Sequence, residues 1–234
     1  MIDYALDNII KDALRGKDEE QKKNHKSSGK LSASMLGQPL QWQILKILGV
    51  PQREIDDYTL RKFQRGKDVE KWVLSFLNAK EQKFVEYRGV VGYVDAIVDA
   101  SEWDCKDGTI PLEVKSVANM KFKRLEKDDD ADRSHKLQAC LYALALGLPK
   151  FGVCYVASDD YRVKTLIYET KEIAPEVEKI ISEFDEQIKK KVVPPLVTKE
   201  VWQENLKYNN YPLFAGLSEA ELIEKSKELF KNIK

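Results

Sequence analysis

The chain of 234 residues is poor in the features that mark membrane, secreted and disulfide-bonded proteins. No apolar run approaches the roughly 18 residues that a membrane-spanning helix needs, and the N-terminus has no signal-peptide pattern. Its three cysteines, Cys105, Cys140 and Cys154, are odd in number and far apart. This spacing argues against a disulfide framework or a zinc site. We therefore expect a protein of the reducing cytoplasm.

An excess of charge of either sign is also missing. Lysine and arginine together number 39, as do aspartate and glutamate, so the formal net charge is zero. Hydrophobic residues make up 43% of the chain, which is ordinary for a globular protein. The length indicates one domain, or one domain with appendages. A chain of zero net charge that binds nucleic acid needs a local basic patch or a partner protein.

Two strands joined by a polar turn form the centre of the predicted structure. Residues 90–98 and 110–117 are rich in β-branched and apolar residues, and the Asp-Gly pair at 107–108 is a hairpin signal. Such a hairpin would bring Asp95 beside Glu113. Lys115 shares the face of Glu113, because side chains two apart on a strand point the same way.

This arrangement would gather two carboxylates and one ammonium group inside an apolar sheet. Close carboxylates repel each other, and burial raises the cost. A divalent cation such as Mg²⁺, which prefers carboxylate and water oxygens, removes that cost. A lysine beside it can orient an attacking water and offset charge on a phosphate. The alternative is that Asp95 caps a strand and that Glu113 and Lys115 form an exposed ion pair; the apolar neighbours favour the buried arrangement.

Further periodic segments surround the hairpin. We expect a flexible polar segment over residues 16–30, and the order of elements predicts an α/β fold with a mixed sheet. The expected helices cover residues 1–15, 31–49 (capped by Ser32 or Ser34), 57–79, 134–147 (capped by Ser134), 173–191, and one opening on a capping box at 218–221; the other strands cover 151–157 and 163–169.

The segment 57–79 carries two residues that a surface helix does not require. Glu70 follows Phe63 by seven residues and precedes Val73 by three, so it lies on or beside the apolar face that we expect these residues to form. A carboxylate there needs a partner, and a shared metal would be one; reaching solvent at the edge of the face is the alternative. Gly66 lowers helix propensity, so we expect another backbone to approach it closely.

Polar side chains downstream complete the candidate site. Gln138 and Tyr142 are four residues apart on a predicted helix and share a face, so together they could bind a phosphate or a metal-bound water, with a purely structural role as the alternative. Basic residues with an aromatic among them follow the hairpin and fit contact with DNA phosphates. The candidate DNA-binding residues are Arg65, Lys67, Lys121, Lys123 and Arg124.

Taken in order, these motifs resemble those of the PD-(D/E)XK nuclease superfamily. They are Gly66 to Glu70, Gly92-x-x-Asp95, Glu113-Val114-Lys115 and Gln138-x-x-x-Tyr142. The last motif is similar to that of the RecB-like branch, which includes CRISPR-associated and phage recombination exonucleases. The resemblance covers about residues 31–170. It implies a restriction-endonuclease-like core with a central mixed β-sheet flanked by helices, and N- and C-terminal helical extensions. The expected organisation is an N-terminal helix and polar segment (1–30), a nuclease core (31–195), and a C-terminal aromatic loop and helix (196–234).

The resemblance also implies roles for single residues. The catalytic residues would be Asp95, Glu113, Lys115, Gln138 and Tyr142, and the ligands of Mg²⁺ or Mn²⁺ would be Glu70, Asp95, Glu113 and Val114. Glu70 stands where many members have a histidine. Iron–sulfur members carry three C-terminal cysteines, and residues 202–214 contain none, so we expect no iron–sulfur cluster.

The activity implied is that of a metal-dependent DNA exonuclease. It would hydrolyse phosphodiester bonds in single-stranded DNA or at duplex ends, in recombination, repair, or CRISPR or phage DNA processing, with a recombination or CRISPR protein as a candidate partner. One alternative is a structure-specific or restriction-like endonuclease that uses the same centre. The other is a catalytically silent DNA-binding scaffold of the same fold. RNA as substrate stays open.

Overall fold

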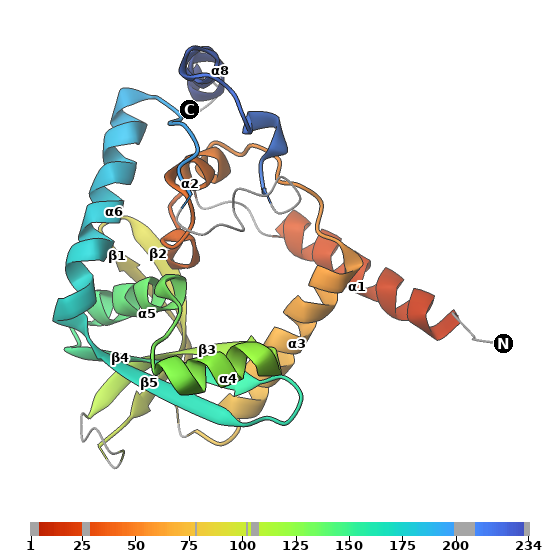
Figure 1. Ribbon diagram of the computed structural model, residues 1–234, viewed down its shortest axis with the longest axis vertical. Coiled ribbons are helices and arrows are strands. Elements are labelled where there is room, and N and C mark those ends of the chain that lie inside the picture. The colour runs from red at the N-terminus through yellow and green to blue at the C-terminus, as the bar shows by residue number, and fades with distance from the viewer. Residues whose placement is uncertain are drawn as a thin grey trace.

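A central β-sheet with helices on both faces forms the body of the protein (Figure 1). The computed structural model describes residues 5–24, 29–77, 79–101, 103, 108–198 and 209–231. In chain order the elements are α1 (Ala5–Asn24), the 3₁₀ helix η1 (Ala33–Met35), α2 (Leu40–Ile47), α3 (Asp57–Leu74), β1 (Lys80–Tyr87), β2 (Val90–Asp99), β3 (Thr109–Val117), α4 (Asn119–Asp128), α5 (Arg133–Leu146), β4 (Lys150–Ala157), β5 (Val163–Glu169), α6 (Thr170–Lys190), the 3₁₀ helix η2 (Pro212–Phe214) and α8 (Glu219–Lys231).

The sheet has five strands in the order β1-β2-β3-β4-β5. All neighbours are antiparallel except β3 and β4, which are parallel. A parallel pair needs a crossover connection, and α4 and α5 supply it. The predicted α/β class, with a mixed sheet flanked by helices and helical extensions at both ends, is confirmed. Each helix among the described residues is too short or too polar to cross a membrane.

Two apolar clusters hold the helices against the sheet. On one face, Val69 and Val73 of α3 belong to a cluster with Leu112 and Val114 of β3. On the other face, α5 packs on the sheet through buried residues such as Leu141. Side chains alternate along a strand, so Glu113 and Lys115 point away from this α3 cluster and towards the face that α5 covers. The polar residues of β3 therefore lie where α3, α4 and α5 come together.

The N-terminal helix is longer than its apolar residues indicate. The predicted flexible segment is wrong for residues 16–24, which continue α1, while residues 25–28 lie outside the described residues. Lysine, glutamate and glutamine dominate this stretch, and their high helix propensity lets the helix continue without apolar contacts. Ion pairs fasten α1 to α3, including Arg15 to Asp57 at 2.6 Å.

Predicted helix boundaries fail where proline or a β-bridge intervenes. Residues 31–49 do not form one helix, because Ser32 makes a β-bridge with Val91 and Pro39 precedes α2 in an extended conformation. Ser32 precedes η1 but makes no side-chain capping bond.

Helix α3 ends at Leu74 rather than at residue 79, and its predicted cap, Asp56, accepts a hydrogen bond from the Thr59 N–H at 2.7 Å.

Strand β1 and helix α4 were not expected from the sequence. β1 is a charged edge strand, joined to β2 by the two-residue turn Arg88-Gly89, in which both residues have positive φ, as tight hairpin turns require. The basic segment after β3 forms helix α4. Helix α5 begins after Asp132 rather than Ser134, whereas the capping box of α8 is present, with Ser218 donating through N–H and hydroxyl to Glu221.

Candidate active site

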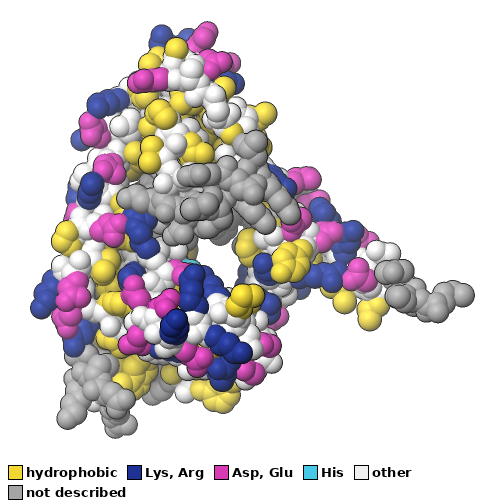
Figure 2. All heavy atoms as spheres, in the orientation of Figure 1, with side chains coloured by type: hydrophobic (Ala, Val, Ile, Leu, Met, Phe, Trp, Pro, Cys, Tyr) yellow, Lys and Arg dark blue, Asp and Glu magenta, His cyan; other side chains and the backbone are white. Residues whose placement is uncertain are grey.

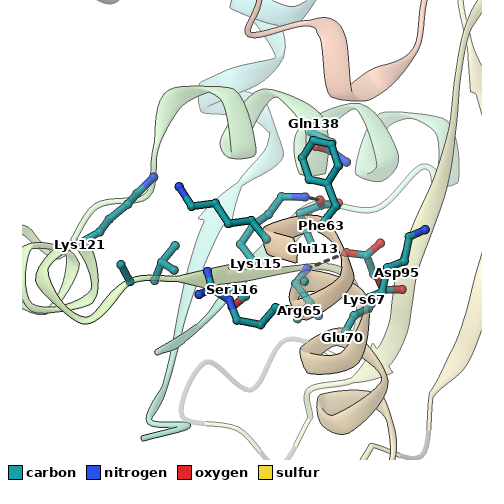
Figure 3. Close-up of a pocket in the computed structure, with 15 residues that line it drawn as sticks. Phe63, Arg65, Lys67, Glu70, Asp95, Glu113, Lys115, Ser116, Lys121 and Gln138 are labelled. Atoms are coloured by element: carbon teal, nitrogen blue, oxygen red, sulfur yellow. Dashed lines mark hydrogen bonds and ion pairs between the residues drawn. The ribbon is translucent and has the colours of Figure 1, made fainter. Parts of the chain in front are cut away.

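The carboxylates of Asp95 and Glu113 come from neighbouring antiparallel strands. Ala96 of β2 pairs with Leu112 of β3, so Asp95 and Glu113 occupy the next position along the ladder. The Val114 N–H donates to Asp95 Oδ2 at 2.8 Å, which ties the aspartate side chain to β3 (Figure 3). The structure thus brings together the two carboxylates that the hairpin prediction placed side by side.

Glu113 is fully buried, and its two oxygens have different surroundings. Oε1 accepts an ion-pair hydrogen bond from the Lys115 ammonium group. Oε2 is buried and has no hydrogen-bond partner among the described residues. Burial raises the pKa of the Glu113 carboxyl, although the charge of Lys115 opposes the shift. A buried carboxylate oxygen without a partner is costly, and it is the kind of atom that a cation would coordinate.

Burial also acts on the pKa values of Asp95 and Lys115. Burial, followed by the charge of Glu113, raises the pKa of Asp95 to about 8. Burial lowers the pKa of Lys115, but the carboxylates of Glu113 and Asp95 outweigh it, so the net shift is upward and the ammonium group stays charged. When both carboxyl groups are ionised, one ammonium group leaves an excess of negative charge, which a divalent cation would neutralise.

Glu70 enters the site from α3 and is half-buried. It lines the same cavity as Asp95 and Glu113, and its charge raises the pKa of both carboxyls. Within the described part of the chain, no three His, Cys, Asp or Glu side chains are grouped closely enough to hold a metal ion. The donor set that fits a hard cation is therefore the adjacent pair Asp95 and Glu113, with Glu70 near enough to act electrostatically.

Gln138 and Tyr142 lie on successive turns of α5 and contact each other. Gln138 Nε2 donates to the Tyr142 hydroxyl at 2.8 Å. Tyr142 is almost fully buried, and burial, followed by the charge of Glu113, raises the pKa of its hydroxyl. Gln138 lines the cavity. A Cβ on Gly92 would lie 2.7 Å from the Tyr142 ring, so only glycine leaves room for it. The close approach expected at Gly66 is wrong, because a Cβ there meets nothing within 4 Å.

These residues line a cavity of about 670 Å³. Its walls come from α3, β2, β3, α4 and α5 (Figure 3). In the space-filling view the molecule is hollowed between α3 and α4, and Lys and Arg side chains lie along the rim (Figure 2). The lining residues are Lys62, Phe63, Arg65, Gly66, Lys67, Glu70, Asp95, Glu113, Val114, Lys115, Ser116, Val117, Ala118, Lys121 and Gln138.

The five predicted DNA-binding residues divide into two groups. Arg65, Lys67 and Lys121 line the cavity, and Lys121 also forms an ion pair with Asp132. Lys123 and Arg124 are exposed on α4 away from the cavity, and Arg124 Nη2 lies 3.1 Å from an Asp132 oxygen. A helix turns by about 100° per residue, so α4 directs Lys121 to the cavity, whereas Lys123 and Arg124 are not among the residues that line it.

Some of the residues that line the cavity were not anticipated as site residues. Phe63 was expected among the apolar residues of the helix, but its side chain is 53% exposed and lines the cavity. Lys62 beside it also lines the cavity, as does Ser116, whose buried Oγ has no hydrogen-bond partner in the described residues. The basic residues around Phe63 are a signal that could have separated it from the core residues of α3.

No protein-family model matches the sequence, and neither does any curated protein. Among solved structures, SSO0001 is 16% identical, with a TM-score of 0.51 over 90% of this chain and 98% of that chain. An alkaline exonuclease (LHK-Exo) from Laribacter hongkongensis is 17% identical, with a TM-score of 0.49 over 69% and 91%. A phage-related exonuclease from Haemophilus somnus 129PT is 12% identical, with a TM-score of 0.45 over 69% and 96%. The likeness to SSO0001 spans most of both chains and is one of fold.

Proposed function

We propose that this chain is a metal-dependent deoxyribonuclease of the PD-(D/E)XK superfamily, RecB-like but without an iron–sulfur cluster. The observation that carries the proposal is the cluster of Asp95, Glu113 and Lys115 in the wall of a cavity bordered by cations. A buried carboxylate pair with an unsatisfied oxygen lowers the stability of the fold. A hard cation bound by these carboxylates would offset that loss of stability.

The metal would be Mg²⁺ or Mn²⁺. Asp95 and Glu113 would hold it through their carboxylate oxygens, with the backbone carbonyl of Val114 as a further ligand. Glu70, which is not grouped closely enough with them to be a third carboxylate ligand, would contribute its negative charge. When bound, such an ion polarises the phosphate and lowers the pKa of water. The unsatisfied Glu113 Oε2 and the raised pKa of Asp95 both support a cation at this point.

The protein's own groups would position and neutralise the substrate. The Lys115 ammonium, kept charged and fixed by Glu113, donates hydrogen bonds to the attacking water and offsets charge on the phosphate. Gln138 would fix the Tyr142 hydroxyl near Glu113 through its hydrogen bond, and Gln138, which lines the cavity, would also contact the substrate. Arg65 and Lys67 would bind the flanking phosphates from α3.

We propose exonuclease action on DNA ends, in recombination, repair, or CRISPR or phage DNA processing in the cytoplasm. The motif from Gln138 to Tyr142 supports this choice, because it resembles that of the RecB-like exonucleases. The hydrogen bond between Gln138 and Tyr142, whose hydroxyl lies near Glu113, also supports it.

The test is degradation of end-labelled linear DNA and of closed circular DNA, each with Mg²⁺, Mn²⁺ or EDTA. We expect metal-dependent loss of label from linear DNA and no attack on the circle. Cutting of the circular DNA would instead identify the protein as an endonuclease that uses the same centre. DNA that is bound but never cut with any metal would indicate a silent scaffold.

A further inference from the structure

The cavity contains one aromatic side chain that the catalytic cluster does not use. Phe63 of α3 is 53% exposed, lines the cavity, and is the only aromatic residue that does so in the described part of the chain (Figure 3). Its neighbours along α3 that also line the cavity include Lys62, Arg65 and Lys67. Because this ring is exposed and surrounded by charged side chains, it adds little to the apolar core of the protein. It is a suitable surface for stacking a flat ring that carries a phosphate.

Two buried donors in the same cavity lack a partner. Arg65 Nε and Ser116 Oγ are both buried, and neither has a hydrogen-bond partner among the residues that the structure describes. Both residues line the cavity, Arg65 from α3 and Ser116 from β3. A phosphate oxygen would accept from an N–H and from a hydroxyl. The cavity therefore offers unused donors for a phosphate next to an unused face for a base.

The spacing along α3 relates this subsite to the catalytic cluster. Phe63 and Glu70 are seven residues apart, which is about two turns and roughly 10 Å along the helix axis. Residues seven apart share a side of a helix, in agreement with both lining one cavity. Bases in a stacked strand rise about 3.4 Å per nucleotide. A base on Phe63 would thus lie two or three nucleotides from the phosphate at the carboxylates.

We infer that Phe63 stacks on an unpaired base close to the cleaved bond, while Arg65 and Ser116 hold a neighbouring phosphate, so that the substrate is a single-stranded end. Inside an intact duplex both faces of each base are covered by the adjacent pairs, and no face is left for Phe63. The inference rests on the proposed nuclease function and narrows its substrate to single strands and frayed ends.

The test measures binding in EDTA, so that its result does not depend on cleavage. A short single strand carries 2-aminopurine at the third nucleotide from one end, and a second probe has it at the other end. Wild type should quench the fluorescence of one of them. Phe63→Ala should abolish the quenching and raise the Kd about tenfold, whereas Phe63→Tyr should retain both. Phe76→Ala is the matched control, because Phe76 is 72% exposed and is not among the residues that line the cavity.

A strand with abasic sites at its three terminal nucleotides separates stacking from other effects. Wild type should bind it as weakly as Phe63→Ala binds the normal strand, and Phe63→Ala should lose no further affinity. An equal loss for Phe63→Ala on both strands, wild-type binding by Phe63→Ala, or failure of wild type to bind single strands would overturn the inference.

Failure of the inference and failure of the proposed function give different results. Metal-dependent cleavage with no effect of Phe63→Ala on binding would leave the nuclease and remove the stacking subsite. Stacking without cleavage on any DNA would support the subsite and remove the nuclease. Thermal unfolding of each variant checks that the fold is intact, which we expect because the Phe63 side chain is largely in solvent.

Discussion

Glu113 and Asp95 are placed where burial makes both carboxyl groups harder to ionise. Glu113 has no exposed surface, burial raises the pKa of both groups, and the charge of Glu113 raises that of Asp95 further. Lys115 compensates one carboxylate, not two. In the absence of a metal, the site should therefore destabilise the fold, and this effect should depend on pH.

The first prediction concerns Asp95→Asn in EDTA. The pKa of Asp95 is about 8 in the fold and about 4 in an unfolded chain. Between these values the folded protein holds a proton that the unfolded chain lacks, so stability is lost as the pH rises, by at most about 1.4 kcal/mol per pH unit. The amide that replaces the carboxyl group in the variant does not titrate. The free energy of unfolding of Asp95→Asn minus that of wild type should increase from about pH 5 to about pH 8.

Urea unfolding at several pH values measures this difference. Asp99→Asn on the same strand is the control. Asp99 is exposed, and hydrogen bonds from Ser101 lower its pKa, so its effect on stability changes with pH only at acidic pH, below the range tested. A difference between Asp95→Asn and wild type that stays constant over this range would contradict the account of the carboxylate pair.

The hairpin pattern predicted that Asp95 lies beside Glu113, and strand alternation predicted that Lys115 shares the face of Glu113; both rules depend on local geometry. The place of Phe63 could not be predicted in this way. Leu60, Val69 and Val73 of α3 are buried, and Phe63 is equally apolar. Which apolar residue of α3 faces the cavity depends on the rotation of the helix against β3, and this is set by packing between distant segments.

At the level of elements, β2 and α5 are fitted to each other at Gly92. The Tyr142 ring occupies the space where a side chain at that position would lie, and the Tyr142 hydroxyl lies near Glu113. The contact between these two elements therefore places the Tyr142 hydroxyl beside the strand that carries Glu113. In α3, by contrast, Gly66 faces open space.

The second prediction compares two glycine substitutions. Gly92→Ala should destabilise the protein by about 1–3 kcal/mol, because the new methyl group overlaps Tyr142. It should also lower the cleavage rate by displacing Tyr142 from Glu113. Gly66→Ala should instead stabilise by about 0.5–1 kcal/mol, because alanine is the better residue inside a helix and meets no obstacle. Thermal and urea unfolding of both variants provide the measurement; a destabilised Gly66→Ala would contradict the open space described there.

Elements with a clean apolar period were predictable, and elements whose stability comes from neighbours were not. β2, β3, β4 and β5 were found from their apolar and β-branched residues. β1 escaped notice because edge strands tolerate charge, and its partner β2 supplies its hydrogen bonds. Pro39 divides the expected helix over 31–49. In its N-terminal part, Ser32 forms a bridge to Val91 of β2, and Ala33–Met35 form the short helix η1.

For the whole molecule, a net charge of zero limits long-range attraction to DNA. Besides Lys115, four cationic side chains nevertheless line the cavity: Lys62, Arg65, Lys67 and Lys121. Binding should therefore depend on salt through these local contacts rather than through the overall charge.

The third prediction is the salt dependence of single-strand binding by wild type in EDTA. If each of the four cations contacts one phosphate, a plot of log K against log salt concentration should have a slope of about −3, at roughly −0.7 per phosphate. Lys62→Ala should reduce its magnitude by about 0.7. Lys123→Ala should leave it unchanged, because Lys123 is exposed on α4 away from the cavity. Equal effects of both variants would place the DNA outside the cavity.

The most direct test of the nuclease centre compares the cleavage rate of wild type with those of Lys115→Ala and Lys123→Ala under single-turnover conditions, on labelled single-stranded DNA with Mg²⁺ or Mn²⁺. Thermal unfolding confirms that each variant is folded. We expect cleavage by wild type and Lys123→Ala that EDTA abolishes, and a rate for Lys115→Ala lower by on the order of a hundredfold or more. Cleavage by folded Lys115→Ala at the wild-type rate would contradict the assignment of Asp95, Glu113 and Lys115 as the catalytic centre.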